Sequence, residues 1–98
     1  MTESEVLVAL REVVDPELGI NVVDLGLVYG VEVEKSRVRV IMTMTSRACP
    51  ISLYVAEMAE TAIRSRDPLL EDVRVDIVWD PPWHPERIAG PARRILGW

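Results

Sequence analysis

Apolar residues recur at helical spacing in three stretches of the chain. Residues 3–14 carry them three or four positions apart, and Thr2-Glu3-Ser4-Glu5 has the form of a capping box at their start. Residues 50–65 keep the same spacing over several turns, and Gly90-Pro91 can open a third, short helix. The residues expected to face inward around that last helix are Ile88, Ala92, Ile95 and Leu96. The pattern predicts three helices.

Apolar and polar residues alternate one by one in three other stretches. Residues 29–34 and 37–44 alternate on either side of Lys35-Ser36, which predicts a β-hairpin with one apolar face. The two linking residues lack Asn-Gly chemistry and leave the turn type open. Residues 73–80 alternate in the same way and predict a third strand.

The predicted elements follow the order α-β-β-α-β-α. Helices on one face of a three-stranded sheet give an α+β, two-layer sandwich. The helix over residues 50–65 returns the chain, so the third strand is expected to run parallel to the second through a right-handed crossover. The sheet is therefore mixed. Whether the third strand lies beside the first or the second strand stays open.

Composition narrows the class of protein. A chain of 98 residues that is 49% hydrophobic has room for one core, so we expect a single domain over residues 1–98. The net charge of −5 makes nucleic acid an unsuitable partner, because phosphate contacts supply much of that affinity. No apolar run is long enough to span a bilayer, and the acidic start does not resemble a signal peptide. We expect a cytoplasmic protein without a membrane partner.

The single cysteine, Cys49, is the first candidate for chemistry. It stands at the predicted start of a helix, with Pro50 behind it, where free backbone N–H groups favour a thiolate. The alternative is a small buried apolar residue. One cysteine excludes an internal disulfide, and one chain alone cannot build a cysteine-rich metal site.

Hydroxyl and carboxylate side chains supply further candidates. Thr45 and Ser46 precede the cysteine, and their hydroxyls can bond a thiolate or simply satisfy the turn. The loop over residues 15–26 is long for so small a chain, which favours a function. In that loop, Asp15 can close a local turn, and Glu17 can form a metal-binding or proton-transfer pair with a thiolate. The spacing alone does not bring residues 17 and 49 together.

Three remaining residues each have two interpretations. Asp24 precedes the first strand and can act as a turn acceptor that supports the loop. Trp83, and with it Tyr54, can contact a partner protein, or Trp83 can pack its loop onto the sheet. His84, the only histidine, can pair with Cys49 as a nucleophilic dyad or stay exposed in its loop.

Known catalytic signatures are missing from the sequence. It contains no phosphate-binding P-loop, no dinucleotide-binding glycine motif, no nucleophile elbow and no paired-histidine zinc motif. No third group stands out to orient a cysteine–histidine pair. We therefore expect a protein that is not an enzyme, with a thiol-dependent enzyme using Cys49 as the alternative.

Three separated motifs resemble one family over nearly the whole chain. The run Asp15-Pro16-Glu17-Leu18-Gly19-Ile20-Asn21-Val22-Val23-Asp24-Leu25-Gly26-Leu27-Val28-Tyr29 resembles the signature of the SufT-like metal–sulfur cluster biosynthetic factors. Thr43-Met44-Thr45-Ser46-Arg47-Ala48-Cys49-Pro50 is similar to the family segment T-x-T-S-x-x-C-P. Asp80-Pro81-Pro82-Trp83, followed by Pro85, is similar to its closing loop.

The resemblance implies a role in assembling or delivering iron–sulfur clusters. Its reactive cysteine corresponds to Cys49, its acidic residues to Asp15 and Glu17, and its threonine to Thr45, and it implies that these residues lie together. It implies partners among the iron–sulfur assembly machinery and recipient apoproteins. One thiolate cannot hold a stable cluster alone, so we expect no permanent cofactor but a labile cluster or iron. Cys49 and Glu17 are the expected transient ligands, and a homodimer can offer two Cys49 thiolates to one cluster.

Other roles stay open beside this one. The chain can be a pure adaptor to recipient proteins, with Cys49 structural. It also resembles an accessory subunit of a phenylacetyl-CoA-type oxygenase system, although the cysteine-rich tail of that branch is missing here. The stand-alone, SufT-like form fits the sequence better.

Overall fold

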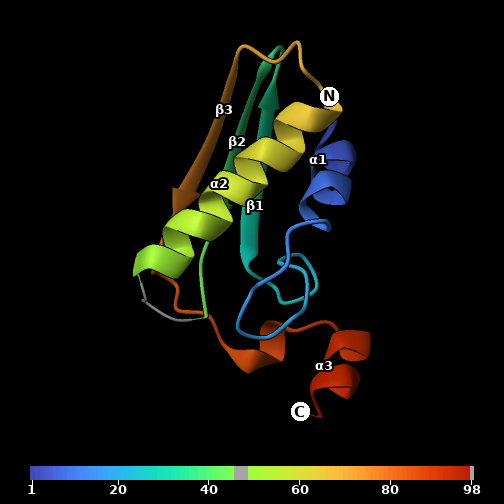
Figure 1. Cartoon of the computed structure of the whole chain (residues 1–98), viewed down its shortest axis with the longest axis vertical. Helices are drawn as coiled ribbons and strands as arrows, with labels where there is room; N and C mark the ends of the chain where they lie inside the picture. Colours follow the sequence, from blue (N-terminus) through green and yellow to red (C-terminus); the bar gives the residue numbers. More distant parts are fainter. Residues whose placement is uncertain (46–48, 98) are drawn as a thin grey trace.

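Three strands form one mixed sheet, and helices precede, interrupt and follow it (Figure 1). The computed structural model describes residues 1–45 and 49–97. Its elements in chain order are α1 (Glu3–Leu10), β1 (Val28–Glu34), β2 (Arg37–Met42), α2 (Cys49–Arg66), β3 (Asp72–Ile77), the 3-10 helix η1 (Pro85–Arg87) and α3 (Gly90–Leu96). The predicted α+β order is confirmed, and η1 is an addition that the periodicity did not predict.

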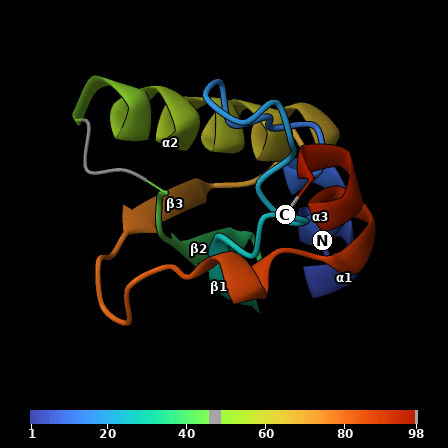
Figure 2. The same cartoon turned by 90° about the horizontal axis from the view of Figure 1, so that it is seen from below.

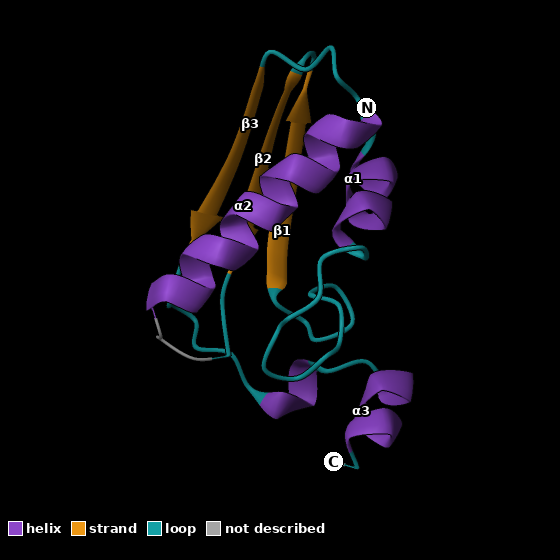
Figure 3. Cartoon of the chain, in the orientation of Figure 1, coloured by secondary structure: helices purple, strands orange, loops and turns teal. Residues whose placement is uncertain are grey.

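The sheet has the strand order β1-β2-β3 (Figure 3). The hairpin is antiparallel, and β3 runs parallel to β2, with Val40 opposite Val75. The position of β3 beside β2 answers the question that the sequence left open. Lys35 in the hairpin turn adopts a positive φ of 51°, which a short turn between twisted strands commonly requires.

Helices α1 and α2 cover one face of this sheet. Figure 2 shows α2 running across the strands, while α1 packs beside α2 and against β1. The side chains that meet between the two layers are fully buried and apolar. The largest fully buried side chains of the core, which also includes residues of the loop before β1, are Leu10, Leu25, Leu27, Met42 and Ile63. Burying a leucine or isoleucine stabilises a fold by about 1.5–3 kcal/mol, so this layer dominates stability.

The first helix is shorter than the sequence predicts. It has the expected capping box at Thr2 but ends at Leu10 rather than near residue 14. Val14 instead forms an isolated antiparallel bridge with Asn21. Val13 is still buried, at 1% exposure. Its helical spacing therefore reflects burial after the end of α1 and does not mark a further turn of the helix.

The last helix lies at the end of the sheet and not on its face. In Figure 1, α3 and η1 lie below the loop over residues 15–26. Ile88 and Ala92 are buried as predicted, and Gly97 ends α3 in the left-handed conformation. The prediction for Ile95 is wrong, because its side chain is 75% exposed. A seven-residue helix resting on a loop buries only a narrow stripe, which is too small for Ile95 to join.

Within the described ranges, no helix is both long enough and apolar enough to cross a membrane.

Candidate functional site

Asp15 organises the loop that follows α1. Its side chain is fully buried, and its Oδ1 accepts hydrogen bonds from the backbone N–H groups of Glu17 at 2.7 Å and Leu18 at 3.2 Å. The backbone closes the same loop, because Gly19 N–H donates to the carbonyl of Asp15 at 2.8 Å. An aspartate before a proline favours this geometry, since proline removes one donor and fixes the turn. The loop is therefore held from inside by one carboxylate.

The second oxygen of Asp15 connects this loop to the segment before α2. Thr45 Oγ1 donates to Asp15 Oδ2 at 3.3 Å, across 30 residues of sequence. The spacing of the residues could not show this contact. It brings the Asp-Pro-Glu motif and the start of the Thr-Ser-x-x-Cys-Pro motif to one place, as the resemblance implied.

Thr43 adds a buried hydroxyl that sequence reasoning did not single out. Its side chain is 1% exposed, and its Oγ1 has no hydrogen-bond partner among the described residues. Its backbone N–H donates to the carbonyl of Leu27 at 2.8 Å, which extends the sheet pairing by one step. A buried hydroxyl without a partner costs about 1–3 kcal/mol. The signal in the sequence was its place two residues before Thr45, which puts both hydroxyls on one side of an extended chain.

Glu17 differs from Asp15 in every respect that matters for ligand binding. It is exposed, and within residues 1–45 and 49–97 its carboxylate has no described partner. Only its backbone N–H is engaged, by Asp15. Asp15 is thus committed to the loop, while Glu17 keeps both carboxylate oxygens available.

Cys49 occupies the first position of α2, as its place in the sequence predicted. The side chains of Cys49 and Pro50, and all of Ser46, lie outside the described residues. The predicted roles of these three residues therefore stay predictions. The backbone alone places Cys49 at a helix start, where unpaired N–H groups favour an anion.

Asp24 is a structural residue of the same loop. Its Oδ2 accepts from the Asn21 amide at 2.9 Å, its backbone N–H donates back to Asn21 Oδ1 at 2.9 Å, and Arg11 lies 3.7 Å from its Oδ1. Its carbonyl accepts from the N–H of Ala89 at 2.7 Å. The turn-acceptor interpretation of Asp24 fits these contacts.

Trp83 fastens the C-terminal segment to the loop. Its ring is half-buried, and its Nε1 donates to the carbonyl of Leu25 at 2.7 Å. Nearby, the Tyr29 hydroxyl donates to the carbonyl of Pro81 at 2.7 Å, and the Arg87 guanidinium lies 4.7 Å from the centre of the Tyr29 ring. Trp83 thus packs its segment against the loop at Leu25, and its role in partner contact stays a prediction.

Gly26 marks the closest approach between the loop and the C-terminal segment. It has a φ of +73°, and a Cβ atom there would lie 2.3 Å from the carbonyl oxygen of Arg87. Only glycine fits both the conformation and the space.

His84 acts as a cap for η1. Its Nδ1 accepts from the backbone N–H of Glu86 at 3.3 Å, and the ring is exposed. This bond uses one ring nitrogen for local structure, and no described contact joins the ring to the site loop.

Metal-binding capacity is limited in the part of the chain that the structure describes. No group of three or more histidine, cysteine, aspartate or glutamate side chains gathers there. A stable iron–sulfur cluster needs about four protein ligands.

Comparison with known proteins identifies relatives over nearly the whole chain. A family model described as "Iron-sulfur cluster assembly protein" matches residues 3–77. The chain is 36% identical to the Fe-S protein maturation auxiliary factor YitW of Bacillus subtilis, over 97% of this chain and 93% of that protein. It is 41% identical to the Fe-S protein maturation auxiliary factor SufT of Staphylococcus aureus, over 87% of this chain and 97% of that protein.

Solved structures share the fold. A domain of unknown function from Bacillus anthracis aligns with a TM-score of 0.91 at 35% identity, covering 97% of this chain and 91% of that chain. A conserved hypothetical protein from Thermotoga maritima aligns with a TM-score of 0.84 at 40% identity, covering 100% of this chain and 96% of that chain.

Proposed function

The chain belongs to the iron–sulfur cluster assembly protein family, and from this premise we propose how it takes part in the maturation of iron–sulfur proteins. The protein is an auxiliary maturation factor, whose near full-length relatives carry that description. In our proposal it binds iron or a cluster transiently through Cys49 and presents it to a recipient apoprotein. The cluster is cargo and not a resident cofactor.

One contact carries this proposal, the hydrogen bond between Thr45 Oγ1 and Asp15 Oδ2 at 3.3 Å. It ties the loop that bears Glu17 to the segment that leads into Cys49. A soft thiolate and a hard carboxylate on neighbouring segments can share one iron. The helix start adds N–H groups that stabilise the thiolate before iron arrives.

The roles of the two acidic residues separate in this proposal. Asp15 is a positioning residue, because both its oxygens accept hydrogen bonds within the protein. Glu17 is the second ligand beside Cys49, because its exposed carboxylate has no described partner. Two protein ligands leave the remaining iron positions to the donor or the recipient, which keeps the cargo exchangeable.

A pure adaptor is the second candidate function. Leu53 and Tyr54 follow the start of α2, and their side chains are 60% and 51% exposed. Exposed apolar and aromatic side chains of this kind are enriched in protein interfaces. In this version the surface beside Cys49 recruits the recipient, and Cys49 does not bind iron.

We propose no enzymatic activity for the chain and place it in the cytoplasm, where thiols stay reduced. A thiol-dependent enzyme would need a base for Cys49, and the engaged Nδ1 of His84 offers little support for that role. The match to stand-alone maturation factors over 93% and 97% of their lengths supports that branch over an oxygenase subunit.

Anaerobic reconstitution with iron and sulfide tests the ligand version. Wild type, Cys49→Ser and Glu17→Gln would each be separated by size-exclusion chromatography, read at about 400 nm where sulfide-to-iron absorption lies, and mixed with an apo-ferredoxin. We expect wild type to carry iron and activate the ferredoxin, Cys49→Ser to do neither, and Glu17→Gln to lose its iron faster. A Cys49→Ser variant that binds and delivers iron like wild type would refute the ligand version and leave the adaptor.

A further inference from the structure

Along the outer edge of β3, the backbone N–H and C=O groups have no neighbouring strand to pair with in the sheet as described. Figure 1 shows no strand beyond β3, which is the terminal strand of the sheet as described. At the start of β3, Asp72 N–H donates to the carbonyl of Ser36 at 3.4 Å, and just after its end Val78 N–H donates to the carbonyl of Met42 at 2.8 Å, both in the direction of β2. Because N–H direction alternates along a strand, the backbone groups of Val73, Val75 and Ile77 point away from the sheet. Such an edge is a template for another strand.

The two faces of β3 carry different kinds of side chain, apolar on one face and charged on the other. Val73, Val75 and Ile77 lie on the face that the helices cover, and Val75 and Ile77 are only half-buried there. Arg74 and Asp76 lie on the open face with opposite charges. The strand thus offers an apolar row on one side and alternating charges on the other.

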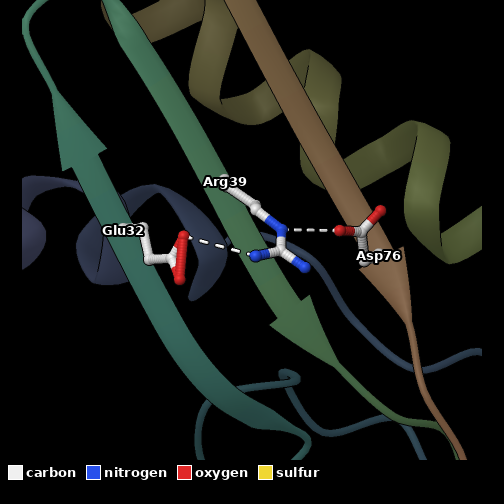
Figure 4. A network of polar contacts seen from close by, with 3 residues as sticks. All are labelled: Glu32, Arg39 and Asp76. Atoms are coloured by element: carbon white, nitrogen blue, oxygen red, sulfur yellow. Dashed lines mark hydrogen bonds and ion pairs between the residues drawn. The ribbon is translucent and has the colours of Figure 1, made fainter.

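On the open face, no ion pair within residues 1–45 and 49–97 joins Arg74 to a carboxylate. Figure 4 shows Arg39 between Glu32 and Asp76, with distances of 3.4 Å and 2.7 Å to their carboxylates. The hydrogen bond that Arg39 Nε donates to Asp76 Oδ2 is the main reason that the pKa of Arg39 is raised. In register, however, Arg74 stands opposite Arg39, a residue of the same charge. Arg74 is exposed, so its guanidinium can pair with an acid from outside the sheet.

One antiparallel register between two copies of β3 supplies that acid. When Val75 faces Val75 of the second copy across a two-fold axis, Val73 faces Ile77, and each Arg74 faces Asp76 of the other chain. Opposite charges directly across antiparallel strands are stabilising. Shifting the strands by two residues either way sets Arg74 against Arg74 or Asp76 against Asp76. The charges therefore favour the register centred on Val75 and disfavour the two registers that are shifted by two residues.

We propose that two copies of this chain associate through the outer edges of β3, in the antiparallel register centred on Val75, with two reciprocal Arg74–Asp76 ion pairs. The joined sheet has six strands and gains about six hydrogen bonds between the two edges. The helices of both copies cover the same face of the joined sheet. The contact is small, so we expect a dimer of modest affinity.

The dimer has a consequence for the site. The first turn of α2 lies at the same end of the sheet as the C-terminal end of β3, in both views of the fold (Figures 1 and 2). In an antiparallel pair, the C-terminal ends of the two β3 strands point in opposite directions. The Cys49 segments of the two copies therefore lie at opposite ends of the joined sheet. The predicted sharing of one cluster by two Cys49 thiolates does not arise from this interface.

A charge-exchange experiment tests the interface. Arg74→Asp and Asp76→Arg would each be examined by analytical ultracentrifugation beside wild type, from about 10 to about 500 µM, where weak dimers populate both states. Each variant sets like charges against each other, and we expect at least about tenfold weaker self-association. Arg94→Asp, which lowers the net charge by as much as Arg74→Asp does but on exposed α3, is the matched control for that variant and should dimerise like wild type.

Mixing the two variants separates the interface from folding. Arg74→Asp paired with Asp76→Arg restores opposite charges at both contacts, so the mixture should form a heterodimer more readily than either variant dimerises alone. Failure of the mixture to associate, or a wild type that stays monomeric throughout the range, would overturn the proposal. Cys49→Ser should dimerise normally, so this test and the iron test fail independently.

Discussion

Asp15 accepts a hydrogen bond from Thr45 with one carboxylate oxygen and two backbone hydrogen bonds with the other. A single buried carboxylate thus shapes the loop and joins it to the segment before α2. The two motifs meet because this one side chain satisfies donors from both.

Replacement of Asp15 should destabilise the protein. Asp15→Ala leaves the part-buried N–H groups of Glu17 and Leu18 and the Thr45 hydroxyl without their acceptor, and we expect a loss of about 1–3 kcal/mol. Urea unfolding followed by circular dichroism measures it. Glu17→Gln is the control, because an exposed side chain without a described partner should change stability by less than about 0.5 kcal/mol. Equal losses in both variants would contradict the division of roles.

The two glycines of the loop form a matched pair. Gly26 and Gly19 have φ angles of +73° and +71°, but only at Gly26 would a Cβ atom meet the backbone of Arg87. Gly19→Ala should cost about 1–2 kcal/mol for the left-handed conformation alone. Gly26→Ala must also displace the C-terminal segment, so its midpoint for thermal unfolding should fall well below that of Gly19→Ala. Similar midpoints would show that the segment is loosely held.

Removing the Trp83 donor should loosen the loop without emptying the core. Trp83→Phe keeps an aromatic ring but loses the hydrogen bond to Leu25, at a cost of about 0.5–1.5 kcal/mol. Hydrogen exchange measured by mass spectrometry should show faster exchange over residues 22–27 and little change in β2. Uniform acceleration across the sheet would mean instead that Trp83 supports the whole fold.

The exposed side chain of Leu53 should matter for partners and not for stability. Leu53→Asp, at 60% exposure, is expected to unfold like wild type and to slow activation of an apo-ferredoxin. Leu69→Asp is the matched control at 88% exposure, remote from the start of α2 in sequence, and should do neither. Equal activation rates for both variants would exclude Leu53 from the docking surface.

Local pattern was enough to predict most of the fold. The alternation around Lys35-Ser36 fixed the hairpin, and the long helical spacing after Pro50 fixed α2, because both elements bury a regular face. The position of Val14 was not predicted, because its bridge to Asn21 is a tertiary contact that ends the helix although the helical spacing continues. The exposure of Ile95 was not predicted, because it depends on which part of the protein α3 packs against.

The site was predicted in its residue types but not in its arrangement. A resemblance, and not the spacing, placed Asp15 and Thr45 together, and the contact between them supports it. The difference between a committed Asp15 and an available Glu17 needs coordinates, because both are acids of one short motif. Thr43 was missed because its place two residues before Thr45 is a weak signal, and the burial of its hydroxyl without a described partner is seen only in the structure.

The fastening of the site loop by the C-terminal segment has a bearing on how the protein is made. Asp24 and Leu25 receive hydrogen bonds from Ala89 and Trp83, which leave the ribosome more than fifty residues later. The loop around Glu17 therefore reaches its final shape only after Ala89 has been synthesised. If Glu17 and Cys49 bind iron as proposed, they do so in chains that have been translated through this segment.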